Sequence, residues 1–298
     1  MIMVKLMGGL GNQMFQYAAA RRLANHHDTS LLMDLSFLKN AHEKNTPRVY
    51  ELKHLNIKAN IALPDQIAEF TKNTRKKRPS RILSHLRRVG LLPPRMHFYA
   101  EQHFQFDASV LDAPDNTYMS GYWQSEKYFL GIEGIIRDEF VVITEADSWN
   151  REMAREIEST ESVSIHIRRG DYVSDSVISE YHGVCPLGYY QEAIDAIVSR
   201  VRSPHFYVFS DDPAWVRDNL KIRHPLRYMD HNGLDQGHED LRLMTLCRHH
   251  IIANSSFSWW GAWLSHNPGK IVIAPEKWFN KKDINTSDLL PDQWIKID

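Results

Sequence analysis

An arginine that follows a short apolar run is the side chain in this sequence best suited to bind a diphosphate. The run ends at Arg168 and is followed by Arg169-Gly170-Asp171. Side chains alternate along a strand, so His166 and Arg168 point the same way. Gly170 permits a sharp turn at the carboxyl end, where open parallel sheets bind ligands. Because a guanidinium donates two charge-assisted hydrogen bonds to phosphate oxygens, we expect Arg168 to bind a pyrophosphate; the structural alternative is an ion pair with Asp171.

A second candidate site is the run Asn254-Ser255-Ser256-Phe257, which follows an apolar stretch and opens an expected helix. Backbone N–H groups at a helix N-terminus, together with the hydroxyls of Ser255 and Ser256, form an anion site. The ring of Phe257 is suited to stacking on a base or a ribose. The alternative is that Ser255 or Ser258 only caps the helix, but the density of polar groups favours ligand binding.

A glycine-rich turn, GGLGNQ at residues 8–13, separates the first expected strand from the first expected helix. Glycines allow close approach of the backbone to a bound group, and the helix N-terminus supplies N–H donors. Gly9 and Gly11 also begin a dinucleotide-binding pattern with Asp34 at the end of the second strand, but the third glycine is missing. An NAD-dependent enzyme is therefore one alternative, and capping of the helix by Asn12 is another.

Polar side chains at other element ends are lesser candidates. Ser210 ends another expected strand and Asp240 opens a helix. Asp211-Asp212 suggests a metal, but the sequence lacks the Asp-x-Asp triplet typical of metal-dependent nucleotide-sugar enzymes. Cys247 and the histidines after it have no second ligand pair at zinc-like spacing. We therefore expect no metal site.

These motifs need elements to position them, and short apolar runs alternate with helical stretches along the chain. Alternation of this kind predicts parallel sheets with helices on both faces, an α/β fold. Two clusters predict two Rossmann-like halves facing a cleft, residues 1–150 and 151–298. We expect the first half to be the acceptor side and the second to bind the nucleotide donor. Strands are expected at 3–6, 31–33, 118–126, 163–168, 205–209, 226–229, 250–253 and 271–274, and helices at 13–26, 186–202, 238–248 and 258–265.

Composition narrows the class of protein. A formal net charge of -1 gives no overall field for nucleic acid or a membrane. Residues 71–88 carry only basic charges; a solvated insertion is favoured, and peripheral contact of residues 72–88 with an anionic membrane is the alternative. Two cysteines, no basic leader and no run of about 18 apolar residues predict a soluble, cytoplasmic protein without a disulfide framework.

Taken together, the motifs resemble the bacterial α-1,2-fucosyltransferases of glycosyltransferase family 11. The resemblance rests on GGLGNQMFQYAAAR at residues 8–21, HIRRGDY at 166–172, FSDD at 209–212 and DLRLMTLCRHHIIANSSFSWWGAWL at 240–264. Residues 57–96 match nothing that we can assign. The resemblance implies a GT-B architecture, GDP-fucose as donor, a terminal β-galactoside as acceptor, inversion, and neither a divalent metal nor a separate cofactor.

The resemblance also implies residue roles. By its position, Asp171 is the first choice for the general base, with Asn12 orienting donor or acceptor; the alternative is a reaction without a strong base. The donor site takes Gly9, Gly11, Asn12, His166, Arg168, Ser210, Asp240, Asn254, Ser255, Ser256 and Phe257. Three alternatives stay open: an NAD-dependent Rossmann enzyme, a non-catalytic GDP-sugar or glycan-binding module, and a GDP-sugar transferase with another donor or linkage.

Overall fold

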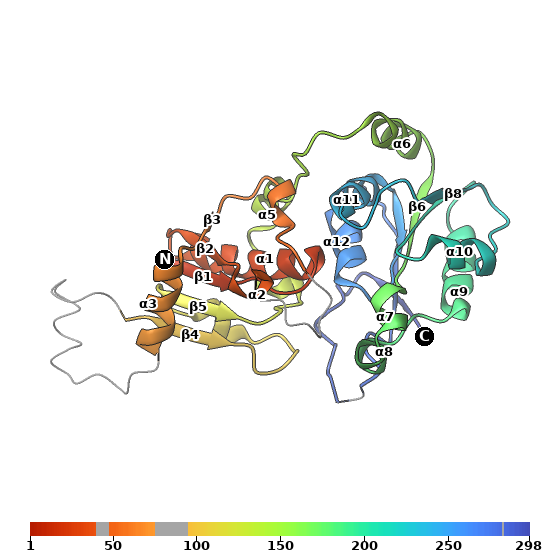
Figure 1. The fold of residues 1–298 in the computed structure, drawn as a ribbon. Helices are drawn as coiled ribbons and strands as arrows, with labels where there is room; N and C mark the ends of the chain where they lie inside the picture. The colour runs from red at the N-terminus through yellow and green to blue at the C-terminus, as the bar shows by residue number, and fades with distance from the viewer. Residues whose placement is uncertain (40–47, 75–94, 282) are drawn as a thin grey trace, which may run out of the picture. The chain divides into compact units, whose positions relative to one another are not determined.

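The protein consists of two compact units (Figure 1). The computed structural model describes residues 1–39, 48–74, 95–281 and 283–298. Unit 1 comprises Met1–Lys53 and Ile57–Glu139, and unit 2 comprises His54–Asn56 and Phe140–Asp298. The expected boundary at residue 150 lies inside helix α6 (Ser148–Glu158), which packs in the core of unit 2. Because a helix cannot bury its apolar face in one unit and be divided between two, the boundary lies at residues 139–140.

In its described part, unit 1 contains a five-stranded parallel sheet of order β3-β2-β1-β5-β4. The strands are β1 (Ile2–Lys5), β2 (Leu31–Asp34), β3 (Asn60–Ile61), β4 (His97–Ala100) and β5 (Thr117–Ser120). From β1 the chain winds outward through β2 to β3, whereas β4 and β5 lie on the other side of β1. The winding direction therefore reverses between β1 and β5, and open α/β sheets bind ligands at such a switch point.

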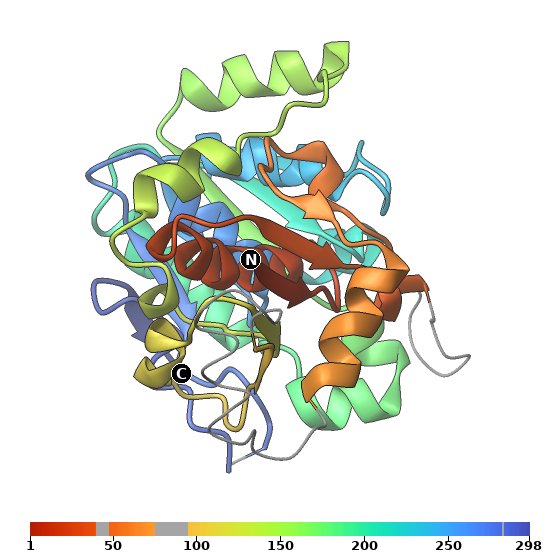
Figure 2. The same cartoon turned by 90° about the vertical axis from the view of Figure 1, so that its left-hand side faces the viewer.

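Helices cover this sheet. Helix α1 packs against β1 and β2, and α3, orange in Figure 2, packs through Phe70 against Met3, Leu32 and Tyr118. The basic stretch from residue 75 to residue 88 lies outside the described residues. The helices are α1 (Leu10–His26), α2 (Ser36–Lys39), α3 (Pro64–Thr74) and α5 (Glu133–Glu139), with short 3-10 turns η1 (Leu52–His54), η2 (Ala108–Asp112) and η3 (Glu126–Tyr128).

Within its described residues, unit 2 contains a six-stranded parallel sheet of order β11-β10-β9-β6-β7-β8. Its winding reverses between β6 and β9. The strand predicted at 226–229 is confirmed, and the strand predicted at 250–253 is β9, displaced toward the N-terminus. The strands are β6 (Ser162–Ile167), β7 (His205–Ser210), β8 (Leu226–Met229), β9 (His249–Ile251), β10 (Val272–Pro275) and β11 (Ile295–Ile297).

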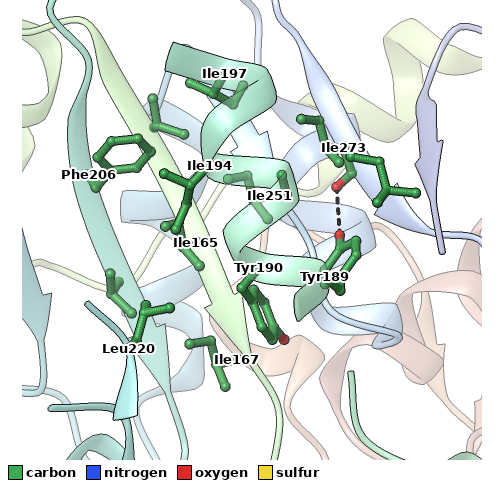
Figure 3. Close-up of a cluster of buried hydrophobic side chains, with 14 of the residues drawn as sticks. Ile165, Ile167, Tyr189, Tyr190, Ile194, Ile197, Phe206, Leu220, Ile251 and Ile273 are labelled. Atoms are coloured by element: carbon green, nitrogen blue, oxygen red, sulfur yellow. Dashed lines mark hydrogen bonds between the residues drawn. The ribbon is translucent and has the colours of Figure 1, made fainter. Parts of the chain in front are cut away.

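Alternating side chains of the central strands pack against helices on both faces of this sheet. Ile165 and Ile167 of β6 pack with helix α9 (Figure 3) and with Val216 of α10. Tyr207 and Phe209 of β7 pack with α6 and α11. The predicted α/β class is therefore confirmed. The remaining helices of the unit are α7 (Gly170–Ser174), α8 (Ser176–His182), α9 (Leu187–Val198), α10 (Pro213–Asn219), α11 (Gly237–Leu246) and α12 (Ser256–Leu264).

A buried tyrosine ties α9 to the sheet edge. The Tyr189 hydroxyl lies 2.6 Å from the carbonyl oxygen of Ile252 and 3.2 Å from that of Ile273 (Figure 3). The Ile273 oxygen already accepts a hydrogen bond from the Ile252 N–H. The tyrosine therefore fixes the backbone where β9 ends and the chain turns toward α12.

Replacing Tyr189 by Phe removes this donor and leaves a buried carbonyl unsatisfied. We expect Tyr189→Phe to lower the free energy of unfolding by about 1–2 kcal/mol, measured by urea denaturation. Tyr99→Phe is the matched control, because the Tyr99 hydroxyl is solvent-accessible and 3.4 Å from Ser109 Oγ. Equal stability losses in the two variants would contradict the role of Tyr189.

Candidate active site

The carboxyl edge of the unit 2 sheet collects the polar residues of three sequence motifs. Strand β6 lies at the centre of the sheet, with β9 on one side and β7 on the other. The segments after β6 and β9 leave the sheet on either side of its switch point. Side chains from both segments are therefore placed where a ligand of an open parallel sheet binds.

Arg168 is the first residue after β6, and its partner is a carboxylate from the neighbouring strand. Its Nη1 lies 2.9 Å from Oδ2 of Asp211, and its guanidinium carbon lies 5.4 Å from the centre of the Tyr172 ring. The arginine side chain is 24% exposed and that of Asp211 10%. The side chain of Asp171, the alternative partner and the expected base, lies outside the described part of the structure.

Asp211 also holds the turn that follows Arg168. Its Oδ1 accepts the backbone N–H of Arg169 at 2.8 Å. A Cβ atom at Gly170 would lie 2.5 Å from Asp211 Oδ2, so a larger residue at this position would displace the carboxylate. Asp211 comes directly after β7, which pairs with β6, and the carboxyl ends of paired parallel strands meet. The sequence does not show that these two strands are neighbours, so it did not predict this contact.

His166 is buried, and it lies on the face of β6 opposite Ile165 and Ile167, as the alternation predicted. Its ring centre lies 5.5 Å from that of Phe257. Burial, and to a smaller extent the charge of Arg168, lowers the pKa of His166 to about 3, so the ring is neutral at physiological pH. Its buried Nδ1 has no hydrogen-bond partner among the described residues, which is unusual unless a ligand or water supplies one.

The serine motif forms the N-terminus of α12. Ser255 is the N-cap residue, but its side chain makes no capping hydrogen bond. Ser258 is buried inside the helix with its Oγ 3.3 Å from the Ser255 carbonyl oxygen, so it does not cap the helix either. Ser255 therefore occupies the capping position, but neither serine side chain makes a capping hydrogen bond. The first-turn N–H groups, for which an α-helix has no internal partner, lie beside Ser255 and Ser256.

Asn254 has a structural function that the sequence did not indicate. Its side-chain nitrogen lies 3.1 to 3.2 Å from the carbonyl oxygens of His182, Gly183 and Trp278. Its Oδ1 accepts a hydrogen bond from the thiol of Cys185 at 3.4 Å. These contacts fix the segment that precedes α12. A contact between Asn254 and a bound nucleotide sugar stays a prediction.

Asp240 and Ser210 are placed at element ends as expected. Asp240 lies in the first turn of α11 and its Oδ1 accepts a hydrogen bond from Asn232 at 2.7 Å. Burial raises the pKa of Asp240 to about 7, although the Asn232 bond opposes the rise. Ser210 ends β7, and its Oγ accepts the backbone N–H of Asp212 at 3.0 Å.

The glycine-rich turn belongs to unit 1, and its helix starts earlier than predicted. Helix α1 begins at Leu10 with Gly9 as N-cap, so Gly11 and Asn12 lie inside the helix and Asn12 does not cap it. The first-turn N–H of Asn12 bonds to the Gly9 carbonyl at 3.0 Å. Gly8 provides the turn, with φ at +74°.

Asp34 does not support dinucleotide binding. It is 1% exposed; its Oδ2 accepts the Tyr118 hydroxyl at 2.5 Å and its Oδ1 accepts the Ser36 N–H at 2.8 Å. A carboxylate that binds a ribose must face the ligand, whereas both oxygens of this one are engaged inside the protein. The NAD alternative therefore loses the residue on which it depended.

Cys247 and the histidines after it, the residues considered as metal ligands from the sequence, make hydrogen bonds inside unit 2. His250 Nδ1 lies 2.8 Å from Ser164 Oγ, and the Cys247 thiol lies 3.6 Å from the Leu243 carbonyl oxygen. Across the described residues, no group of three or more His, Cys, Asp or Glu side chains is arranged to hold a metal ion. Neither cysteine forms a disulfide.

The sequence profile of glycosyl transferase family 11 matches residues 106–298. The chain belongs to this family. This glycosyltransferase is 33% identical to an alpha-1,2-colitosyltransferase of Escherichia coli. The alignment covers 100% of the present chain and 99% of the Escherichia coli protein. It is also 26% identical to a galactoside alpha-(1,2)-fucosyltransferase 2 of Sus scrofa over 71% of the chain and 72% of that protein.

The fold of the glycosyltransferase is similar to that of the alpha-1,6-fucosyltransferase NodZ in a crystal soaked with GDP-fucose. The TM-score is 0.53 at 14% identity, over 90% of this chain and 96% of that one. The two Rossmann-like units are therefore those of a GT-B glycosyltransferase, as the resemblance implied. Among the described helices, none combines the length and apolar character that crossing a membrane requires.

Substitution at Gly170 tests the coupling between Asp211 and Arg168. The added methyl group of Gly170→Ala displaces the Asp211 carboxylate, and with it the guanidinium. We expect GDP to raise the melting temperature of this variant much less than that of the wild type. Gly188→Ala in α9 is the control, because a Cβ there meets nothing within 4 Å. An undiminished GDP response in Gly170→Ala would show that the Asp211 contact is unimportant.

The neutral state of His166 predicts a pH dependence of stability. An unfolded histidine with the ordinary pKa of 6.5 binds a proton that the folded one takes only near pH 3, so stability is lost as pH falls below 6.5. Between pH 7 and pH 5 we expect the unfolding free energy to fall by roughly 2 kcal/mol more in the wild type than in His166→Gln. Urea titrations at both pH values measure this; parallel losses in the two proteins would refute it.

Proposed function

We propose that the protein is an inverting, metal-independent transferase that moves L-fucose from GDP-fucose to the 2-hydroxyl of a terminal β-galactoside. Membership of glycosyl transferase family 11 and a galactoside alpha-(1,2)-fucosyltransferase among the relatives support this reaction. The observation that carries the proposal is the Arg168 guanidinium at the switch point of unit 2, oriented by Asp211. A fixed cation at this place is suited to stabilise the charge of departing GDP.

The reaction requires two bond changes at the anomeric carbon of fucose and one proton transfer from the acceptor. The acceptor oxygen forms a bond to that carbon, the bond to the β-phosphate oxygen breaks, and the acceptor proton goes to a base. Negative charge grows on the β-phosphate, where a preorganised guanidinium and the N–H groups of a helix N-terminus stabilise it most. Arg168 and the α12 terminus at Ser255-Ser256 supply these groups. Asp171 is the first candidate for the base, with Asn12 orienting donor or acceptor.

The remaining residues of the donor site have supporting roles. Phe257 and neutral His166 form an apolar wall with one unsatisfied ring nitrogen, which suits the nucleoside or the sugar. In this proposal Asp240 accepts hydrogen bonds from guanine. Ser210 shapes the turn that carries Asp211, because its Oγ accepts the backbone N–H of Asp212. Gly9 and Gly11 belong to unit 1, and their contact with the fucose stays a prediction. Asn254 is proposed to act indirectly, because it fixes the segment before α12 and so positions the serines that contact the phosphates.

A second candidate is transfer of colitose, which is fucose without its 3-hydroxyl. The 33% identity to an alpha-1,2-colitosyltransferase over the full chain favours it. The two sugars share the diphosphate leaving group, so Arg168 has the same role in both reactions. GDP release with GDP-fucose and with GDP-colitose, at equal concentrations, separates the two donors.

We propose a cytoplasmic location and a β-galactoside of a surface glycan as the natural acceptor. The basic stretch at residues 72–88 remains the candidate for peripheral contact with the inner membrane. Sedimentation with anionic vesicles, compared with neutral ones, tests that contact directly.

Replacing Arg168 tests the counter-charge. We expect Arg168→Ala to lower kcat by about 10²–10³, as for loss of a preorganised donor to developing negative charge. Arg168→Lys keeps the positive charge but loses the planar guanidinium with its two parallel N–H donors. Its kcat should therefore lie between that of the wild type and that of Arg168→Ala. The assay is GDP release from GDP-fucose with lactose, and NMR of the product gives linkage and anomeric configuration.

Arg217→Ala is the control for this experiment, because it removes an exposed arginine of unit 2 that is paired with Asp230. Its rate should equal that of the wild type. The same assay is run with EDTA and then with added magnesium or manganese. Wild-type activity in Arg168→Ala, or strict dependence on a divalent cation, would overturn the proposed mechanism.

A further inference from the structure

The sheet of unit 1 has a switch point of its own, between β1 and β5. The glycine-rich turn follows β1, and residues 121–124 follow β5. A hydrogen bond of 2.8 Å from Gln124 Nε2 to Asn12 Oδ1 joins the two segments. Polar groups are thus gathered at the edge where this sheet, taken by itself, is suited to bind a ligand.

The turn after β5 is strained. Trp123 has φ at +55° although it is bulky and only 1% exposed. Gly121 has no room for a side chain, since a Cβ there would lie 2.4 Å from Glu101 Cβ. Strain of this kind costs on the order of 1–3 kcal/mol and persists where surrounding structure and function require it. The indole Nε1 of Trp123 is buried and has no hydrogen-bond partner among the described residues.

Glu101, the residue after β4, holds the turn in this conformation. Its carboxylate accepts the backbone N–H of Tyr122 at 2.7 Å and that of Trp123 at 3.0 Å. Burial raises the pKa of Glu101, and the two N–H bonds oppose the rise. The Trp123 ring packs edge-on against Tyr128, with ring centres 5.5 Å apart. A desolvated carboxylate and a buried indole therefore fix one short loop.

The loop presents an aromatic ring with charged groups beside it. The Tyr122 residue is 39% exposed. Partial burial of its hydroxyl, and to a smaller extent the charge of Glu101, raises the pKa of the phenol, whereas the charge of Arg48 opposes the rise. The Arg48 guanidinium and the Glu51 carboxylate face the glycine turn, each 3.7 Å from where a Gly9 Cβ would be. An exposed ring provides apolar contact for the C–H face of a neutral sugar, and the neighbouring polar groups match its hydroxyls.

We infer that this loop is the binding platform for the acceptor sugar: Tyr122 stacks on the galactoside ring, and Glu101 is the positioning residue that holds Tyr122 in place. The ligand class is a neutral pyranoside. The inference rests on the proposed function and adds to it the residues that determine acceptor affinity. It requires no chemical step at Glu101 and concerns unit 1 alone.

Kinetics with lactose as acceptor and GDP-fucose as donor test the platform. We expect Tyr122→Ala to raise KM for lactose by about tenfold or more, while KM for GDP-fucose and GDP release by hydrolysis without acceptor stay unchanged. Tyr122→Phe keeps the ring and should behave more like the wild type than like Tyr122→Ala. Phe98→Ala is the control, because it removes a 50% exposed ring from β4 of the same unit.

Saturation-transfer NMR with methyl β-galactopyranoside, without any donor, gives a second measurement. Binding by the wild type and Tyr122→Phe but not by Tyr122→Ala supports the platform even if no transfer occurs. Transfer to lactose with an unchanged KM in Tyr122→Ala overturns the inference and leaves the proposed function standing. Absence of transfer to every galactoside contradicts the proposed function, and equal sugar binding by all variants contradicts the platform.

Discussion

The ion pair between Arg168 and Asp211 sets the requirements that the rest of unit 2 meets. A guanidinium is useful to a leaving diphosphate only if it is held in place before the charge develops. The carboxylate that holds it comes from the next strand, because Ile167 of β6 pairs with Ser210 of β7. The same carboxylate binds the Arg169 N–H and leaves no room for a side chain at Gly170. Asp211 therefore holds the Arg168 side chain and the turn at Arg169-Gly170 in one arrangement.

Buried polar side chains fix the segments that leave each sheet. In unit 2, Tyr189 and Asn254 bind carbonyl oxygens around the start of α12. In unit 1, Glu101 binds two N–H groups after β5, and Asp34 binds Tyr118 and Ser36 after β2. An unsatisfied buried polar group is expensive, so each of these contacts defines one conformation of its loop. Loops of this kind present ligand-binding groups without having to order them first.

The two units use the same topology for different chemistry. Each has a parallel sheet whose winding reverses beside a central strand, at β1 in unit 1 and at β6 in unit 2. In unit 2 the groups at this edge are cationic or N–H donors, which match a nucleoside diphosphate. In unit 1 they are an exposed tyrosine with carboxylates and amides, which match a neutral sugar. The proposed donor and acceptor roles therefore rest on these side chains, since the backbone pattern is shared.

Local patterns in the sequence were enough to determine the α/β class, the opposite orientation of His166 and its two isoleucine neighbours along β6, the serine-rich start of α12 and the candidate status of Arg168. Alternation along a strand and the residue preferences of helix ends act over a few residues, so they can be read without a fold. Tertiary structure alone decided that Asp211 pairs with Arg168, that Asp34 is occupied by Tyr118, and that Glu101 holds Trp123 in a strained turn. These partners are distant in the chain and meet because parallel strands pair in one register and bring their carboxyl ends to the same edge. That register depends on the packing of whole sheets against their helices, and no short segment of sequence contains it.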